Sequence, residues 1–176
     1  IKIGNFKEPF GLENLTSSKD DSFMEESLGT TFAPGRNTGI AIANNAKDKR
    51  LAYALGVFRE SDSFGDASGD NAAYNITGRI SGVPIWDEDG DNYLHLGVSL
   101  SHKEMDGSYS VSQRAEAHMA EKITGVSVDA DTVDLIGLEA AYVRDSLYIQ
   151  VEYTSTSVDG NTGIEDADFS GYYAQV

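Results

Sequence analysis

The sequence predicts an all-β fold, an antiparallel β-barrel that crosses a membrane, from three observations. Apolar residues alternate with small or polar ones through several segments, each roughly the 9–11 residues that a tilted membrane-spanning strand needs. Short and long links alternate between these segments, as they do in membrane β-barrels. The 18 Gly, 9 Tyr, 7 Phe and only 3 Pro in 176 residues suit strands joined by tight turns. Because no repeat or linker divides the chain, we expect one unit over residues 1–176, part of one barrel domain.

Alternation places the apolar side chains of each predicted strand on one face, because successive side chains of a strand point to opposite sides. The segment RLAYALGVFR, residues 50–59, has Leu, Tyr, Leu and Val on one face and Ala, Ala, Gly and Phe on the other. The pattern repeats in YNITGRISGVPIW, YLHLGVSLSH and SLYIQVEYT. We expect eight crossing strands, at residues 1–6, 38–45, 50–59, 74–84, 93–102, 133–143, 147–157 and 168–176.

The lengths of the links decide one ambiguous segment. Tight polar turns are expected at residues 46–49, 87–92 and 144–146, and long links at residues 60–73, 103–132 and 155–167. The stretch SYSVSQRAEAHM, residues 108–119, also alternates as a strand does. If residues 108–119 crossed the membrane, the tight turn at residues 144–146 would lie on the same side of the membrane as the long links. We therefore expect residues 108–119 in an external loop, as one arm of a hairpin.

The stretch KEPFGLENLTSSKDDSFMEESL, residues 7–28, interrupts the run of strands. Ser18 followed by Asp21 predicts an N-cap with a short amphipathic helical turn behind it. The stretch carries more apolar side chains than a solvated loop, namely Phe10, Leu12, Leu15, Phe23, Met24 and Leu28. The inward positions of the next two strands are small and leave room inside the barrel: Gly39, Ala41, Ala43, Ala52, Ala54 and Gly56. We expect a constriction loop, containing a short helix, bent into the lumen.

Charge and composition exclude several classes of function. The chain has 13 Lys and Arg against 29 Asp and Glu, a formal net charge of −16, which repels phosphate backbones, so we expect no nucleic-acid partner. The absence of Cys excludes disulfides and thiolate metal sites. No Ser/His/Asp constellation, nucleophile elbow or Gly-rich phosphate loop is present. We expect no enzymatic activity and no cofactor.

Two features raise the question of a metal site. The turn DEDGDN, residues 87–92, is similar to a calcium loop, but its Gly is the fourth residue rather than the sixth and no Glu follows at the twelfth. A solvated hairpin turn is the better interpretation. His95, His102 and His118 lack the spacing that puts two ligands on one face, so lumen or loop positions are expected for them. We expect no bound metal.

Three stretches, KIGNFKEPFGLENLTSSKDDSFME, APGRNTGI and FSGYYAQV, resemble the phosphate-selective porin O/P family of Gram-negative outer membranes. A looser likeness extends over the rest of the chain, including RAEAH and GLEAAY. The resemblance implies a barrel of sixteen strands, of which about eight are present here, with a third loop folded into the pore. It also implies a homotrimer surrounded by outer-membrane lipid. By this comparison the chain is an internal fragment that lacks a signal sequence and begins and ends within strands.

The resemblance implies passive diffusion of small hydrophilic solutes, including phosphate or other anions, past lumen Lys and Arg side chains. The expected pore-lining or constriction residues are Lys2, Lys19, Glu25, Glu26, Arg36, Arg79 and Arg114. The alternation of side chains places Lys2 and Arg79 on the inward face of their strands, but it places Glu139 and Glu152 there as well. Glu26 stands where the family commonly has a basic residue, so the mixed lumen predicts weak anion selectivity or none.

Other interpretations stay open at this level. Arg36 either faces the pore or pairs with Glu25 or Glu26, and Arg114 carries a similar ambiguity. The aromatic residues near strand ends form either interfacial girdles or ordinary cross-strand pairs: Trp86, Tyr93, Tyr142 and Tyr153. The whole chain fits two further folds, a closed eight-stranded barrel that does not conduct and a soluble β-sandwich that binds carbohydrate.

Overall fold

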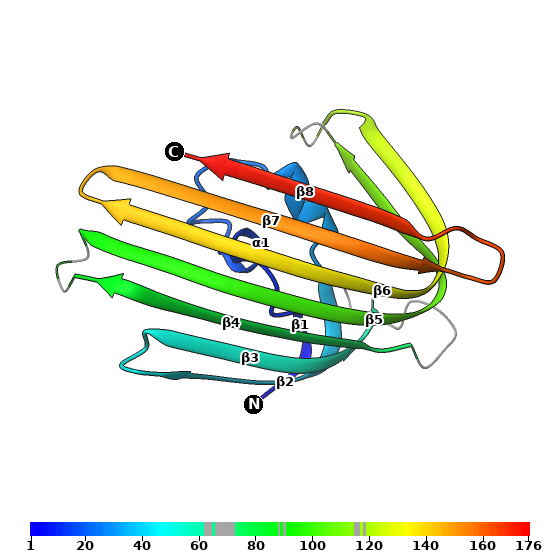
Figure 1. Ribbon diagram of the computed structural model, residues 1–176, viewed down its shortest axis with the longest axis horizontal. Helices are drawn as coiled ribbons and strands as arrows, with labels where there is room; N and C mark the ends of the chain where they lie inside the picture. The colour runs from blue at the N-terminus through cyan, green and yellow to red at the C-terminus, as the bar shows by residue number, and fades with distance from the viewer. Residues whose placement is uncertain (62–64, 66–72, 88, 90, 115–116, 118) are drawn as a thin grey trace.

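A computed structural model gives the fold of the chain (Figure 1). The structure describes residues 1–61, 65, 73–87, 89, 91–114, 117 and 119–176. Of the positions considered above, Glu88, Gly90, His118 and most of residues 60–73 lie outside the described residues. No helix in the described part of the chain is long and apolar enough to cross a membrane.

Eight antiparallel strands form one sheet in which each strand pairs with its neighbours in the sequence, in the order β1 to β8 (Figure 1). Their bounds are β1 Lys2–Lys7, β2 Arg36–Ala46, β3 Leu51–Arg59, β4 Asn75–Trp86, β5 Asn92–Arg114, β6 Lys122–Arg144, β7 Leu147–Gly160 and β8 Ala167–Gln175. The all-β, antiparallel prediction and all eight predicted strands are confirmed. The regular alternation of the sequence made this possible, because each strand has one apolar face.

The sheet is open in the described part of the chain, since β1 pairs only with β2 and β8 only with β7. A closed eight-stranded barrel would join β1 to β8, so that alternative is wrong. A β-sandwich would need a second sheet packed on the first, but the described strands belong to one sheet. A single curved sheet of eight strands is instead what part of a larger barrel looks like.

Strands β5 and β6 have 23 residues each and extend well beyond their neighbours. Register shifts between Glu104 and Gly107 on β5, and between Ala130 and Thr132 on β6, mark where the pair bends. The part beyond the bend, residues 107–130, is here called the arm, and Figure 1 shows it turning away from the line of the sheet. The prediction that residues 108–119 belong to a hairpin arm rather than a crossing strand is confirmed for the described residues up to Arg114.

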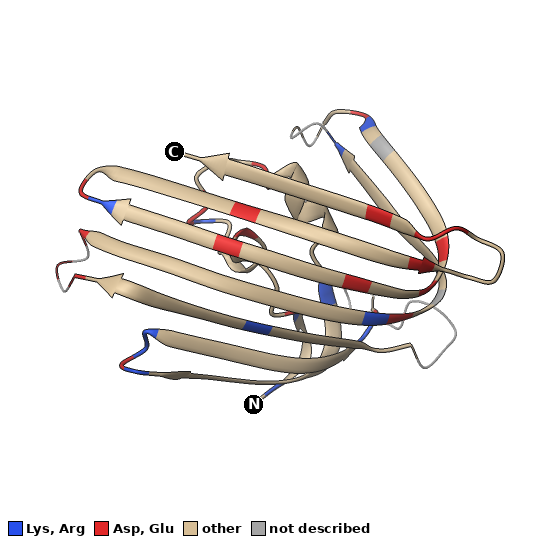
Figure 2. Cartoon of the chain, in the orientation of Figure 1, with Lys and Arg blue, Asp and Glu red and all other residues tan. Residues whose placement is uncertain are grey.

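One face of the sheet, here called the outer face, carries apolar side chains that are 38–56% exposed: Ile40, Ile42, Tyr53, Leu55, Val57, Ile76, Ile80, Leu96, Val98, Leu100, Ile136, Leu138, Val151 and Tyr153. Charged residues gather at turns and loops, and single charged residues also occur within β4 to β8 (Figure 2). An apolar surface of this extent is unusual on a soluble monomer. It is the surface expected where strands face the hydrocarbon of a membrane.

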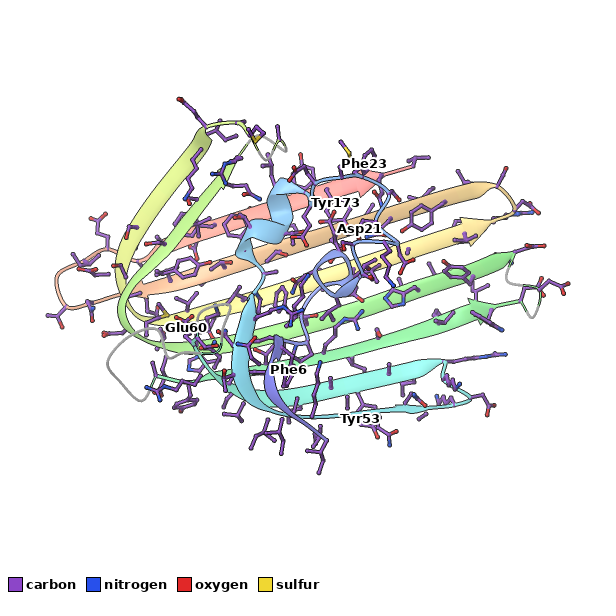
Figure 3. The ribbon with its side chains drawn as sticks, turned by 180° about the vertical axis from the view of Figure 1, so that it is seen from behind. Phe6, Asp21, Phe23, Tyr53, Glu60 and Tyr173 are labelled. Atoms are coloured by element: carbon purple, nitrogen blue, oxygen red, sulfur yellow. The ribbon has the colours of Figure 1, made fainter. Side chains whose placement is uncertain are left out.

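Residues 8–35, here called the insert, connect β1 to β2 and lie against the other face of the sheet, the inner face (Figures 1 and 3). The insert contains a short helix α1, Leu12–Leu15, and a 3₁₀ helix η1, Leu28–Phe32. The prediction of a loop with a short helix folded against the inner wall is confirmed. The predicted N-cap at Ser18 is wrong, because the helix begins after Gly11 and residues 18–20 form a turn.

The apolar residues of the insert are buried less completely than the sequence predicts. Phe10 is only 1% exposed and joins the main core, with Tyr109 of the arm and Val133, Leu135 and Val158 of the sheet. Phe23 and Met24 are 66% and 101% exposed. Burial of the insert therefore depends on Phe10 and Pro34 near its two ends rather than on a continuous apolar face.

The small inner-face residues of β2 and β3 serve a purpose different from the one predicted. A Cβ atom at Gly39 or Gly56 would lie 2.5 or 2.6 Å from the ring of Phe58. Phe58 packs there against Phe6, with ring centroids 5.3 Å apart. The 3₁₀ helix η1 of the insert lies against β5, β7 and β8. Ala43, Ala52 and Ala54 line an open hollow together with Arg79, so the space predicted at those positions exists but does not hold the insert.

Adjacent residues of β2 give a direct test of which face meets lipid. Ile42 is on the outer face and 53% exposed, and Ala43 is exposed in the inner hollow. We expect Ile42→Arg to lower the free energy of unfolding in lipid vesicles by about 2–4 kcal/mol, the cost of Arg near the bilayer midplane. Ala43→Arg should change it by less than about 1 kcal/mol, because lumen positions remain in water. Urea titration in vesicles, followed by Trp86 fluorescence, measures both, and equal costs would contradict the assignment of the faces.

Candidate pore constriction

The carboxylate of Glu152, on the inner face of β7, holds the start of helix α1. Its two oxygens accept hydrogen bonds from the backbone N–H groups of Leu12 (2.7 Å) and Glu13 (2.6 Å), and a third from the hydroxyl of Tyr173 (2.5 Å). Free N–H groups at the first turn of a helix attract a carboxylate in this way. The cap of α1 thus comes from a strand 140 residues away in the sequence.

Gly11 makes this close approach possible. Its φ of +72° lies in the left-handed region, which favours glycine. A Cβ atom there would also lie 3.1 Å from Oε2 of Glu152. Next to Gly11, the ring of Phe10 lies over Gly137 of β6, where a Cβ atom would come within 2.9 Å of the ring. Two glycines therefore let the insert dock on its wall.

Glu8 is a second carboxylate that fixes the insert, and it is fully buried. Its oxygens accept hydrogen bonds from the side-chain amides of Asn37 (2.7 Å) and Asn75 (2.9 Å) and from the hydroxyl of Thr77. A buried carboxylate costs several kcal/mol unless its oxygens receive donors. The three donors come from β2 and β4, so Glu8 joins the beginning of the insert to the wall near β1.

Glu13, the third carboxylate, closes the insert on itself. It accepts hydrogen bonds from the backbone N–H of Ser27 (3.1 Å), the hydroxyl of Ser27 (2.6 Å) and the hydroxyl of Thr30. Lys7 adds a further link, because its ammonium group donates to the carbonyl of Asn14 (2.6 Å) and lies 3.6 Å from Glu26. The insert is therefore a folded loop with fixed ends, not a flexible strap.

On the wall beside the insert, Arg79 of β4 pairs with Glu139 of β6 through two hydrogen bonds, one of 3.1 Å from Nε. His95 of β5 lies 2.7 Å from the same carboxylate. Gly97 leaves the room for this cluster, since a Cβ atom there would lie 2.3 Å from a carboxylate oxygen of Glu139. The charge of Arg79 is largely neutralised where it lies.

A curved sheet with an apolar outer face, a polar inner face and a tied inner loop is the geometry of a porin wall and its constriction. The family model for phosphate-selective porins O and P matches residues 1–176. The chain belongs to this family.

Porin O of Pseudomonas aeruginosa is 24% identical to the chain over 203 residues, an alignment that includes 100% of this chain and 45% of that porin. The chain thus spans less than half the length of this curated relative. Members of the porin O/P family are Gram-negative outer-membrane porins, channels rather than enzymes. The resemblance and the outer-membrane location predicted from the sequence are confirmed.

Of the predicted porin site residues, Lys19, Glu25 and Glu26 lie in the insert, whereas Lys2 and Arg79 lie on the wall. Glu25 and Glu26 line a cavity between the insert and the wall, and Arg79 lies on the inner face as its parity predicted. Lys2 lies with its ammonium group 4.2 Å from the ring centroid of Phe6. Lys19 is exposed on the turn of the insert.

The remaining two predicted residues lie away from this group. Arg36 is exposed at the first position of β2, and it is the neighbouring Asn37 whose side chain reaches Glu8 on the inner face. Arg114 lies at the end of β5 in the arm, where its Nε donates to the carbonyl of Ala120 (2.9 Å). A pore-lining role for any of the seven residues stays a prediction.

Sequence reasoning missed Glu8 and Glu13, which look like ordinary loop acids. The available signal was the row of polar inward residues Asn37, Asn75 and Thr77, which a water-filled lumen does not by itself require. Trp86 and Tyr93 line the cavity on the inner face, so assigning them to a lipid girdle is wrong. Tyr142 and Tyr153 follow inward Ala141 and Glu152 and therefore lie on the outer face, as a girdle requires.

Removal of the Glu152 carboxylate should loosen the insert without unfolding the sheet. Glu152→Ala deprives two backbone N–H groups of their acceptor, at about 1–3 kcal/mol, so we expect the amides of Leu12 and Glu13 to exchange roughly 5- to 150-fold faster. In Glu152→Gln, which keeps one carbonyl oxygen, these amides should exchange at a rate between those of the unmodified porin and Glu152→Ala. Hydrogen exchange with mass spectrometry on the complete porin in detergent measures the effect.

Glu165→Ala, in the exposed link before β8, removes the same charge and serves as control. Unchanged exchange at Leu12 and Glu13 in Glu152→Ala would contradict the anchoring role.

Proposed function

We propose that this chain forms the wall and the constriction of a water-filled outer-membrane channel, through which small hydrophilic solutes diffuse passively. The observation that carries the proposal is the contrast between the two faces of one sheet. The outer face exposes apolar side chains, whereas the inner face holds polar groups and a loop that is fixed by the buried carboxylate of Glu8 and the half-buried carboxylate of Glu152. Such an arrangement narrows an aqueous path without closing it.

The complete protein in this proposal is a barrel of sixteen strands that assembles as a homotrimer. Eight strands in a chain that aligns with 45% of Porin O are in keeping with a barrel about twice this size. The exposed apolar outer face supplies the surface for lipid and for neighbouring subunits.

Phosphate and other small anions are among the proposed solutes, as the name of the family indicates, but with weak selectivity. Cationic side chains along the inner wall are matched by carboxylates. Arg79 pairs with Glu139, Lys7 lies 3.6 Å from Glu26, and Lys103 lies 3.6 Å from Glu60. A cation that already has a carboxylate partner attracts a passing anion less than a free one does.

Conductance of the complete porin in a planar bilayer tests the proposal. We expect stepwise current increases that scale with salt concentration, with three closing levels per inserted unit if the channel is a trimer. Reversal potentials under KCl and potassium phosphate gradients then give the selectivity, which we expect to be close to that of free diffusion. Recovery of the complete protein as a soluble monomer that forms no channels would overturn the proposal.

Selectivity should change when the partner of Arg79 loses its charge. Glu139→Gln leaves Arg79 uncompensated, and a unit charge roughly 5–10 Å from a permeating ion changes its energy by about 0.4–0.8 kcal/mol in water. Because the anion is favoured and the cation disfavoured by this amount, we expect the anion-to-cation permeability ratio to rise about four- to fifteenfold at low salt. Asp168→Asn removes a charge from an exposed position near the start of β8 and should leave the ratio unchanged. Identical ratios in Glu139→Gln and the unmodified porin would show that this cluster does not face the ion path.

A further inference from the structure

A cavity of about 220 Å³ lies between the insert and the inner wall. It is near the end of the sheet where short turns join β4 to β5 and β6 to β7. Figure 3 shows Asp21 and Phe23 of the insert on this side of the sheet. Among the described residues that line the cavity, none is Lys or Arg. The single basic group is His95, which is already engaged with Glu139.

Aromatic rings form one wall of the cavity. A β-bulge between Gly82 and Ile85 shifts the alternation of β4 by one residue and brings Trp86 opposite Tyr93. The two rings lie 6.2 Å apart between centroids and line the cavity together with Tyr148 of β7, and Phe23 lines it from the insert. Trp86 is 47% exposed, so its ring is accessible to a solute.

Carboxylates from the insert form the opposite wall, namely Glu13, Asp20, Asp21, Glu25 and Glu26. Asp20 is exposed and Asp21 half-buried, so both reach the water of the cavity. Such a site repels anions. Aromatic faces beside carboxylates attract organic cations, which gain both cation–π and Coulomb interactions there.

We propose that this cavity is a binding subsite for small organic cations that carry an ammonium group, on the path of the channel. The inference rests on the proposed channel function and names a solute class for the same constriction. A neutral sugar would use the rings but not the charge, and inorganic phosphate would be repelled by the carboxylates. The three solute classes therefore separate in one experiment.

The experiment measures the concentration of choline that halves the K⁺ current through the complete porin in a planar bilayer, with maltose and inorganic phosphate as comparison solutes. We expect choline to act at a lower concentration than either. Asp20→Asn with Asp21→Asn should raise the half-blocking concentration of choline about threefold or more. Trp86→Ala should raise it similarly, whereas Trp86→Phe, which keeps an aromatic face, should retain most of the effect.

Asp48→Asn with Asp145→Asn is the matched control. Both residues are exposed in the tight turns after β2 and β6, and their positive φ of 54° and 53° suits Asn as well as Asp. This pair removes the same charge without touching the cavity and should leave block by choline unchanged.

Outcomes that overturn the subsite differ from those that overturn the channel. If stable current steps are present, three results would overturn the subsite alone. These are no block by choline, equal block in the unmodified porin and the Asp20/Asp21 variant, and stronger block by maltose or phosphate than by choline. Absence of current steps in the unmodified porin would overturn the proposed channel itself. The Trp86 variants test the subsite independently, should the double Asp variant fail to assemble.

Discussion

Three carboxylates hold the insert in place. Their oxygens accept hydrogen bonds from backbone N–H groups, side-chain amides and hydroxyls. Glu152 binds the first N–H groups of α1, Glu8 binds side chains from two strands, and Glu13 closes the loop. Glu8 and Glu152 have no Lys or Arg in these described contacts, so the donors themselves stabilise the charge. The loop is thus tied to the wall by directional hydrogen bonds in addition to the burial of Phe10.

This way of anchoring the loop explains features of the wall that otherwise look unrelated. Glycines lie where a larger residue would displace a docking contact of the loop, at Gly11 beside Glu152 and at Gly137 beside Phe10. Amides and hydroxyls point inward at Asn75 and Thr77 because Glu8 needs donors there. The aromatic contact of Phe32 with Phe169, 6.3 Å between centroids, then fills the space next to η1. Polar and apolar contacts share the docking of the loop.

The strands of the sheet could be predicted from the sequence, but the contacts that dock the insert could not, for a physical reason. Strand positions follow from alternation, a local signal, and parity correctly put Arg79, Glu139 and Glu152 on one face. The start of α1 could not be found locally, because its cap is contributed by Glu152 from β7 rather than by Ser18. Likewise the small residues of β2 and β3 signal close packing but not its partner, which is Phe58. One bulge, at Gly82 to Ile85, was enough to move Trp86 to the other face.

The distance along the chain between the loop and its anchors also governs how the protein is put together. Leu12 and Glu152 are separated by 140 residues, and Glu8 and Thr77 by 69. Contacts between parts so remote in sequence form late, after the chain that separates them has been ordered. The insert therefore stays undocked until β7 has joined the sheet, because its cap at Glu152 does not exist in place before then.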